Sequence, residues 1–305
     1  MSCSRFASHW AANPVVITDA MLLSHSVAET DYTAWSSGTA YAVGDRCIQN
    51  HKIYEALQAG TNHSPALDAT LALPFWLEVS STNRWRAFDQ QVNSQTTATG
   101  SITFAVQPGA INAIGFVELT GETVRVQMFD GAASIYDATQ SIDGTSILSW
   151  ADYFFSAYDL SAALVFDNVP QYLAATVVVT ISGAGTVGCG SAIFGQLYWL
   201  GDTQFGASAG VTDYSTKTTN IYGVTKITRR AFSKRSTQRL ELDNATLRRT
   251  QALIANLRAT PCLWIGADDT QTFSPLAVYG YWRDFQIEIA YPRKSYCSLE
   301  IEGMI

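Results

Sequence analysis

Apolar and polar residues alternate over much of the chain, which predicts β-strands. The clearest case is Val124–Met128, where Arg125 and Gln127 separate the apolar positions. A period of two turns one face of a strand toward a core and the other toward solvent. Between residues 82 and 200 the expected strands are Ser101–Val106, Ala113–Leu119, Thr123–Phe129, Ala162–Phe166, Leu173–Ile181 and Ala192–Leu200. Evenly spaced short strands without helices between them predict a β-sandwich.

The pattern before residue 82 predicts a small hairpin unit within a first segment, residues 1–81. A short helix is expected around Thr18–Ala28. Strands are expected at Tyr41–Ala42, Arg46–Gln49 and Lys52–Ala56, because Gly44-Asp45 and Asn50-His51 supply turns between them.

The pattern after residue 200 predicts a third segment, residues 201–305, with strands around one helix. Leu247, Leu253, Ile254 and Leu257 share one face of the predicted helix Asn244–Ala259. Asp243 or Asn244 is expected to cap it and Pro261 to stop it. The expected strands are Ile221–Ile227, Arg239–Leu242, Cys262–Ile265, Val278–Ile289 and Ser298–Glu302.

A glycine motif at Gly183–Gly188 matches the dinucleotide-binding pattern G-x-G-x-x-G. That pattern binds a pyrophosphate only when a helix follows, because the helix supplies the N-terminal amides. Here another strand pattern follows, at Ala192–Trp199. We therefore interpret the motif as a glycine-rich hairpin and expect no dinucleotide.

Composition and charge narrow the function classes. Apolar residues make up 47% of the 305 residues and charged residues only 15%, which suits β-structure with hydroxylated or covered surfaces. No apolar run approaches the roughly 18 residues that a membrane-spanning helix needs. The N-terminus MSCSRFASHW lacks the apolar region of a signal peptide, so we expect synthesis in a cytoplasm.

The residues that carry catalysis or bind metals are sparse, so the sequence predicts no enzyme, cofactor or metal site. All four histidines lie within the first 63 residues, and no two of the five cysteines have metal-ligand spacing. We expect the thiols to be reduced and buried. Asp268-Asp269 falls in a turn, while Glu300 and Glu302 share one strand face, so the sequence nominates no pair of carboxylates to flank a glycosidic bond.

Basic residues concentrate between Lys226 and Arg258. This segment holds nine basic residues against two acidic ones and carries +7, whereas the rest of the chain carries −14. A nucleic-acid site, a solvated helix face and a protein interface all remain open. No aromatic platform or groove-reading helix accompanies the charge, which favours an interface with another protein chain. The expected interface residues are Arg229, Arg230, Lys234, Arg235 and Arg239.

The hairpin unit, about residues 32–78, resembles the chitin- and cellulose-binding modules of carbohydrate-binding families 5 and 12. The matching elements are Ala34-Trp35, Tyr41-Ala-Val-Gly44-Asp45, Tyr54-Glu-Ala56, Pro65 or Pro74, and Trp76. The resemblance implies sugar contact through Trp35, Tyr41, Tyr54 and Trp76. Where the family places exposed aromatics, directly after Tyr-x-Ala, this chain has Leu57-Gln58-Ala59. The alternative is a structural spacer whose aromatics form its core.

Two further resemblances concern the rest of the chain. The sandwich, beginning at Thr82-Asn83-Arg84-Trp85, looks like a galactose-binding-like jelly roll, a likeness of fold alone. The layout of about the last 100 residues resembles tail-tip and distal-tail components of long-tailed phages, whose tube-like β domain assembles into rings.

Together the three resemblances imply a structural component of a bacteriophage tail tip or baseplate in the virion tail. The expected partners are copies of the chain in a trimeric or hexameric ring, other tail proteins and a host-surface glycan, with no nucleic acid. The alternatives are a glycoside hydrolase or a secreted lectin that carries a carbohydrate-binding module.

Overall fold

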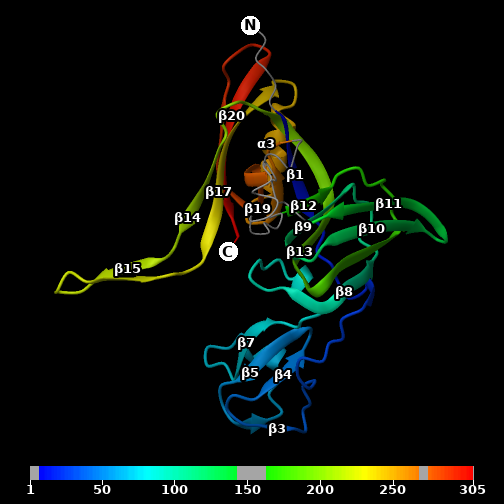
Figure 1. The fold of residues 1–305 in the computed structure, drawn as a ribbon, viewed down its shortest axis with the longest axis vertical. Coiled ribbons are helices and arrows are strands. Elements are labelled where there is room, and N and C mark those ends of the chain that lie inside the picture. Colours follow the sequence, from blue (N-terminus) through cyan, green and yellow to red (C-terminus); the bar gives the residue numbers. More distant parts are fainter. Residues whose placement is uncertain (1–6, 143–162, 268–273, 305) are drawn as a thin grey trace.

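The protein is mostly β, as predicted. A computed structural model describes residues 7–142, 163–267 and 274–304. Its strands form three parts (Figure 1): a small module at one end, a β-sandwich beside the middle of the molecule, and an elongated C-terminal sheet from which a hairpin projects.

The module is built from two small sheets. β4 (Arg46–Gln49), β5 (Lys52–Ala56) and β7 (Trp76–Ser81) pair in the order β4-β5-β7, and β3 (Ala40–Tyr41) pairs with β6 (Gly60–Thr61). The one-turn helix α1 (Pro65–Asp68) precedes β7. The strands predicted at Arg46–Gln49 and Lys52–Ala56 are confirmed. Asn50 and His51 both take positive φ and form the tight turn that joins β4 to β5.

The helix predicted at Thr18–Ala28 does not form. Instead β2 (Leu22–His25) pairs with β8 (Thr96–Val106) of the sandwich, and Leu22 packs against the sandwich core. Tertiary pairing therefore overrides the local pattern. β1 (Ala7–Pro14) lies still farther from the module, because it pairs with the C-terminal strand β18 (Cys262–Ile265).

A single long strand, β13 (Thr176–Thr203), connects the sandwich with the C-terminal sheet. Its first residues pair with β8 and β10 (Thr123–Asp130), its middle with β9 (Ala113–Thr120), and its end with β1. The glycine-rich hairpin predicted at Gly183–Gly188 was therefore wrong. The motif lies within β13, and its pairing with β8 shifts register between Ser182 and Thr186. The predicted segment boundary after Leu200 also falls inside this strand. A strand continues after the motif, so the dinucleotide fold is not formed there.

The sandwich core is dense with large side chains. β11 (Ala133–Ser141) forms one edge of the order β11-β10-β13, and β12 (Ala163–Phe166) pairs with β9. These strands, together with the short η1 (Arg86–Phe88), enclose one cluster that includes Phe104, Phe116, Met128, Phe166 and Phe194.

The C-terminal sheet continues from β1 in the order β18-β19-β20-β17-β14. The remaining bounds are β14 (Ser208–Asp213), β17 (Phe232–Asp243), η2 (Ser274–Leu276), β19 (Ala277–Glu288) and β20 (Lys294–Gly303). The helix α3 (Leu247–Asn256) packs on this sheet with Ile254 and Leu257 buried.

The helix face was predicted correctly, but its cap was not. Asp243 belongs to β17, Asn244 donates its side-chain amide to the Tyr291 carbonyl, and Thr246 holds the N-cap position. The helix also ends before Pro261, with Ala259 at positive φ beyond it. Glu300 and Glu302 alternate with buried Leu299 and Ile301 along β20, as predicted.

A two-stranded hairpin, here called the arm (residues 214–231), projects from the end of β14 and β17 (Figure 1). It consists of β15 (Thr216–Thr219) and β16 (Thr225–Thr228). The continuous strand predicted at Ile221–Ile227 was wrong, because Asn220 accepts hydrogen bonds from the Tyr222 and Val224 amides and holds a turn there.

Candidate interaction surfaces

Three of the four aromatics proposed for sugar contact lie in the module core. Tyr54 and Trp76 are 4% and 1% exposed, and Tyr41 meets Trp76 edge to face at 5.0 Å between ring centroids. The Trp76 indole donates to the His63 carbonyl, and the Tyr41 hydroxyl accepts from the Ser36 amide. Trp35 packs half-buried against the same cluster. Buried rings offer no free face to a sugar, so for these residues the structure fits the spacer alternative.

The aromatic pair nearest the module surface was not singled out from the sequence. His63 stacks on Phe75 at 3.8 Å, nearly parallel, and the His63 side chain is 46% exposed. Leu73, two residues before Phe75, is among the most exposed apolar side chains of the protein. Sequence reasoning missed this pair because the family pattern places the sugar-contacting aromatics elsewhere in the module.

The five basic residues proposed for an interface do not act alike. Arg239 is engaged within the molecule: its guanidinium lies 4.6 Å from the centre of the Tyr296 ring and 3.4 Å from a Glu288 oxygen. Lys234 is half-buried, and its charge opposes the burial that raises the pKa of Glu118 in the sandwich. Arg229, Arg230 and Arg235 are exposed. In the residues that the structure describes, these three form no ion pair within 4 Å.

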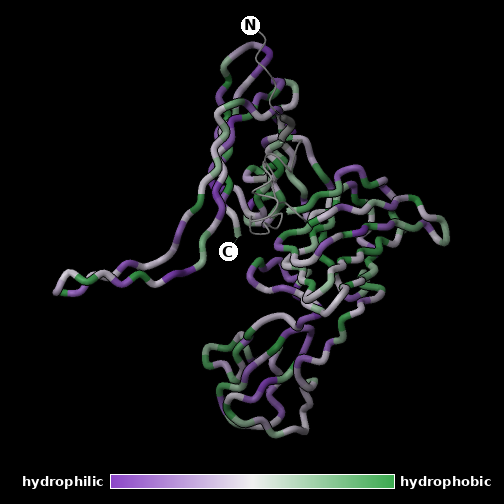
Figure 2. Tube along the Cα trace, in the orientation of Figure 1, coloured by the Kyte–Doolittle hydropathy of each residue, from purple (hydrophilic) through white to green (hydrophobic). Residues whose placement is uncertain are grey.

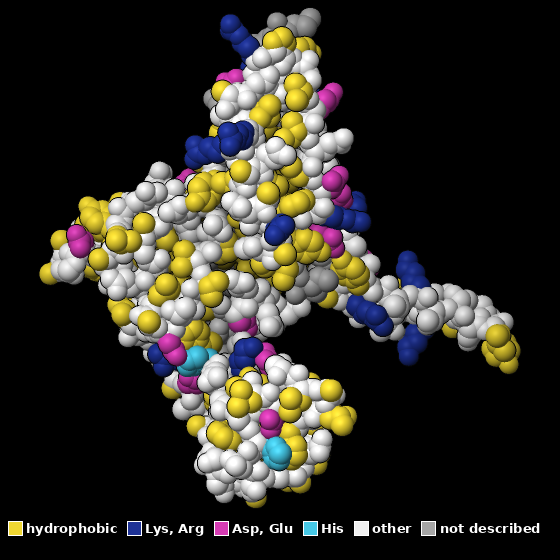
Figure 3. All heavy atoms as spheres, turned by 180° about the vertical axis from the view of Figure 1, so that it is seen from behind, with side chains coloured by type: hydrophobic (Ala, Val, Ile, Leu, Met, Phe, Trp, Pro, Cys, Tyr) yellow, Lys and Arg dark blue, Asp and Glu magenta, His cyan; other side chains and the backbone are white. Residues whose placement is uncertain are grey.

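The arm gathers further positive charge. Besides Arg229 and Arg230 it carries Lys217 and Lys226, and it holds no acidic residue. The arm thus contributes +4, and the remainder of the chain carries −11. Figure 3 shows these dark-blue side chains along an arm that is otherwise uncharged. In the described part of the chain, none of the four forms an ion pair within 4 Å.

The tip of the arm is apolar and exposed. Ile221 and Tyr222 are 92% and 84% exposed, and Val224 and Ile227 are exposed as well. Hydrophobic positions recur out to the tip in Figure 2, and yellow side chains cap the arm in Figure 3. Gly223 has φ +79°, and with Asn220 it closes the turn that carries the exposed side chains of Ile221, Tyr222 and Val224.

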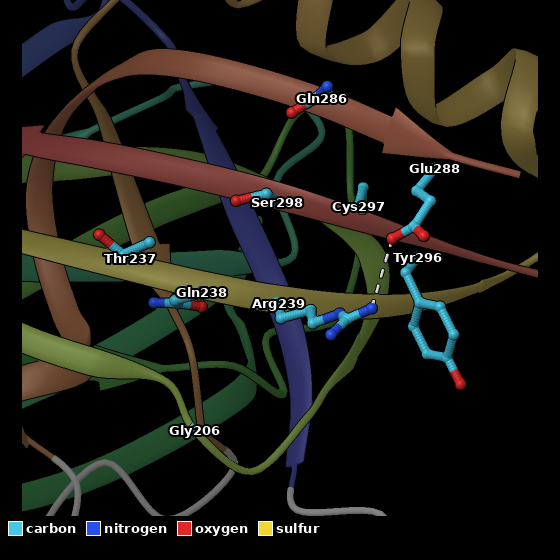
Figure 4. Close-up of a pocket in the computed structure, with 9 residues that line it drawn as sticks. All are labelled: Gly206, Thr237, Gln238, Arg239, Gln286, Glu288, Tyr296, Cys297 and Ser298. Carbon is cyan, nitrogen blue, oxygen red and sulfur yellow. Dashed lines mark hydrogen bonds and ion pairs between the residues drawn. The ribbon is translucent and has the colours of Figure 1, made fainter. Parts of the chain in front are cut away.

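A hollow of about 380 Å³ lies on the C-terminal sheet, on strands β17, β19 and β20 (Figure 4). Thr237, Gln286 and Ser298 line it, and the Arg239–Glu288 pair crosses one end. Glycoside hydrolysis needs two carboxylates about the scissile bond. Glu288 is the carboxylate among the residues that line this hollow, so the hollow lacks that arrangement.

The cysteines that the structure describes are free and buried: Cys47, Cys189, Cys262 and Cys297. Burial raises the pKa of Cys47 to about 11 and those of Cys189, Cys262 and Cys297 to about 12, which suppresses the nucleophilic thiolate. Cys3 lies outside the described residues. Within those residues no group of three or more histidine, cysteine or acidic side chains is placed to hold a metal ion.

None of the helices in the described residues is long and apolar enough to cross a bilayer. Comparison with known proteins adds no family: the sequence matches no protein-family model and no curated protein.

Proposed function

We propose that this chain is a structural subunit that assembles with copies of itself, as a component of a bacteriophage tail tip or baseplate. In this proposal the C-terminal sheet and its arm form the contacts of a ring. The module and the sandwich lie outside the ring, where they can meet other tail proteins or a host surface. The placement in a phage tail rests on the sequence resemblance, and assembly rests on the arm.

The observation that carries assembly is the exposed arm. An isolated two-stranded hairpin is marginally stable in water. This one also holds Ile221, Tyr222 and Val224 in solvent, and fully burying such a side chain is worth roughly 1.5–3 kcal/mol. Because Asn220 and Gly223 already fix the turn, docking the tip on a partner costs little conformational entropy. These properties favour a surface that a partner covers.

Charge favours a second copy of the chain as that partner. The arm contributes +4 and the remainder of each chain −11, so a neighbouring copy presents the opposite sign. An arm that meets a different surface of its neighbour makes a heterologous contact, and such contacts close into rings when the rotation permits.

A nucleic acid would also attract a basic ribbon with an apolar tip. Some architectural proteins insert apolar wedges between base pairs in this way. That alternative predicts an affinity for duplex DNA that falls steeply with salt, by roughly one decade of affinity per decade of salt for each phosphate contacted.

The test is the oligomeric state of the purified protein, measured by electron microscopy and mass photometry. We expect rings from the wild type. Replacing Arg229, Arg230 and Arg235 by Glu should abolish them, because the three exposed charges then repel an acidic neighbour. A matched control replaces the equally exposed Arg248, Arg249 and Arg258 by Glu on or just after α3, and should leave assembly intact.

Normal assembly of the variant with Glu at positions 229, 230 and 235, or a wild type that stays monomeric at all concentrations, would contradict the proposal. Tight DNA binding by the wild type at physiological salt would favour the nucleic-acid alternative instead.

A second candidate function is glycan contact by the module. The stacked His63 and Phe75 pair supports it, since a flat ring partly open to solvent can pack against a sugar face. Affinity electrophoresis against chitin and cellulose derivatives, with His63→Ala as the comparison, tests this candidate. Release of soluble sugar in the same samples would instead support the glycoside-hydrolase alternative.

A further inference from the structure

His51 stands where the module meets the rest of the protein. It lies at the tip of the β4–β5 turn, and both of its ring nitrogens face carboxylates of the segment that precedes the module. Nε2 lies 2.7 Å from an Asp19 oxygen, and Nδ1 lies 3.1 Å from both oxygens of Glu29. The His51 side chain is 33% exposed and that of Glu29 is 21% exposed, so this pair is partly shielded from solvent, whereas Asp19 is 74% exposed.

The same ring also touches the sandwich. The centroids of His51 and Trp85 are 4.4 Å apart, and Trp85 belongs to the sandwich core. Thr82, at the start of the sandwich, donates its amide to the His51 carbonyl and its hydroxyl to Glu29. One residue thus joins three segments that are distant in sequence.

The geometry matches the protonated ring. A neutral imidazole carries one N–H, so it can donate to one of the two carboxylates, whereas the imidazolium donates to both. A cation over an indole face gains a further attraction. Loss of the proton therefore removes one hydrogen bond, weakens the contact with Trp85, and leaves Asp19 and Glu29 without their cation.

Other charged groups around this junction are held elsewhere or lie farther off. Asp31 accepts from the Asn83 amide, Arg86 donates to the Ser81 carbonyl, and the neighbouring Lys52 pairs with Glu78. Arg84 follows Asn83 in the same turn, and its charge acts on His25. Asp19 and Glu29 are the charges that act on the His51 ring.

We propose that His51 is a proton-controlled latch that fixes the orientation of the module when protonated and frees the module when neutral. This goes beyond assembly, because it concerns how the module is presented and does not depend on ring formation.

The direction of the pKa shift agrees with this geometry. Burial lowers the pKa of His51, but the hydrogen bonds and charges of Asp19 and Glu29 outweigh that effect and raise it above the usual value of 6.5. A group whose pKa is raised on folding contributes its full stabilisation below the unfolded value and loses it as pH rises through the folded value. The latch is therefore closed near pH 5.5 and opens on the alkaline side of 6.5.

The test is single-molecule energy transfer in the full chain, with dyes on the module at Leu73 and on the sandwich at Ser134, between pH 5.5 and 9. We expect one narrow distance at low pH and a broad distribution at high pH, with the midpoint above 6.5. His51→Gln should remove the transition and give the broad distribution throughout. His63→Gln is the matched control, since His63 also pairs with a carboxylate, Asp68, at 3.1 Å, but within the module.

A distance distribution that does not change with pH would overturn the proposal, as would a transition that survives in His51→Gln or disappears in His63→Gln. If His51→Gln fails to fold, the double variant Asp19→Asn and Glu29→Gln keeps the ring and should move the midpoint to lower pH. An unmoved midpoint in that variant would also refute the latch. His25 does not titrate between pH 5.5 and 9, because burial and the charge of Arg84 lower its pKa to about 4.

Discussion

At the scale of single residues, the module's aromatics act by filling space. Trp76 is 1% exposed and lies among Tyr41, Tyr54, Cys47 and Ala56. Replacing a buried tryptophan by alanine costs about 3–5 kcal/mol, and so small a core has little to spare. We expect Trp76→Ala to unfold the module while the sandwich stays folded, as measured by limited proteolysis and thermal denaturation.

The matched control for that prediction is Leu73→Ala, a change to an exposed side chain of the same module. It should leave the module folded. The outcome that would count against a core role is a folded Trp76→Ala module that has lost retention on polysaccharide.

The residue scale also shows what the sequence could not reveal. The pattern of the carbohydrate-binding families identified Tyr54 and Trp76 as key residues of the module. The spacer alternative predicted that their side chains form its core. The contacts of His51 could not be predicted, because Asp19, Glu29 and Trp85 reach it only once the module has docked on its neighbours. Charge alone likewise could not separate Arg239, which forms an ion pair with Glu288, from Arg229, which forms none within 4 Å among the described residues.

At the scale of elements, local patterns predicted strands well where a turn and an alternating run agreed. β4 and β5 appear with their predicted bounds because Asn50 and His51 take the positive φ that a tight turn needs. The prediction failed where pairing between strands distant in sequence determines the structure. β2 is extended because it pairs with β8. β13 is continuous because β8, β10, β9 and β1 pair with it along its length.

The continuity of β13 makes a prediction about two of its glycines. At Gly195 a β-carbon would collide with the Asn13 carbonyl, where β1 pairs with β13. At Gly185 a β-carbon would meet nothing within 4 Å. We expect Gly195→Ala to lower the free energy of unfolding by about 2 kcal/mol or more, and Gly185→Ala to change it by less than about 1 kcal/mol.

Chemical denaturation of the two variants measures this difference. Equal stability of Gly195→Ala and wild type would mean that β1 does not approach β13 as closely as the structure places it. A loss in Gly185→Ala as large as that in Gly195→Ala would show that the glycines matter through backbone freedom rather than space.

At the scale of the whole molecule, one sheet runs from the sandwich into the C-terminal part, and among the described strands its main path ends at β11 and β14. Open edges invite pairing with another chain unless they are covered. The arm continues from the end of the edge strand β14 (Figure 1), and it carries both the exposed apolar tip and the four basic residues. The sequence could not predict this arrangement, because a turn that projects and a turn that folds back have the same local pattern.

The arm gives the last prediction, which concerns self-association. Replacing Ile221, Tyr222 and Val224 by Ser removes three exposed apolar side chains and leaves Asn220 and Gly223 to hold the turn. If a neighbouring copy buries even part of these side chains, more than about 1.4 kcal/mol is lost, which is a factor of ten in affinity. We expect at least that weakening in analytical ultracentrifugation, with the monomer's thermal stability unchanged because Ile221, Tyr222 and Val224 are 92%, 84% and 63% exposed. Leu67, Leu71 and Leu73 of the module are exposed to a similar degree, so their triple replacement by Ser is the control for a general loss of surface hydrophobicity. Unchanged association of the tip variant, or equal weakening in the control, would show that the arm is not the contact between copies.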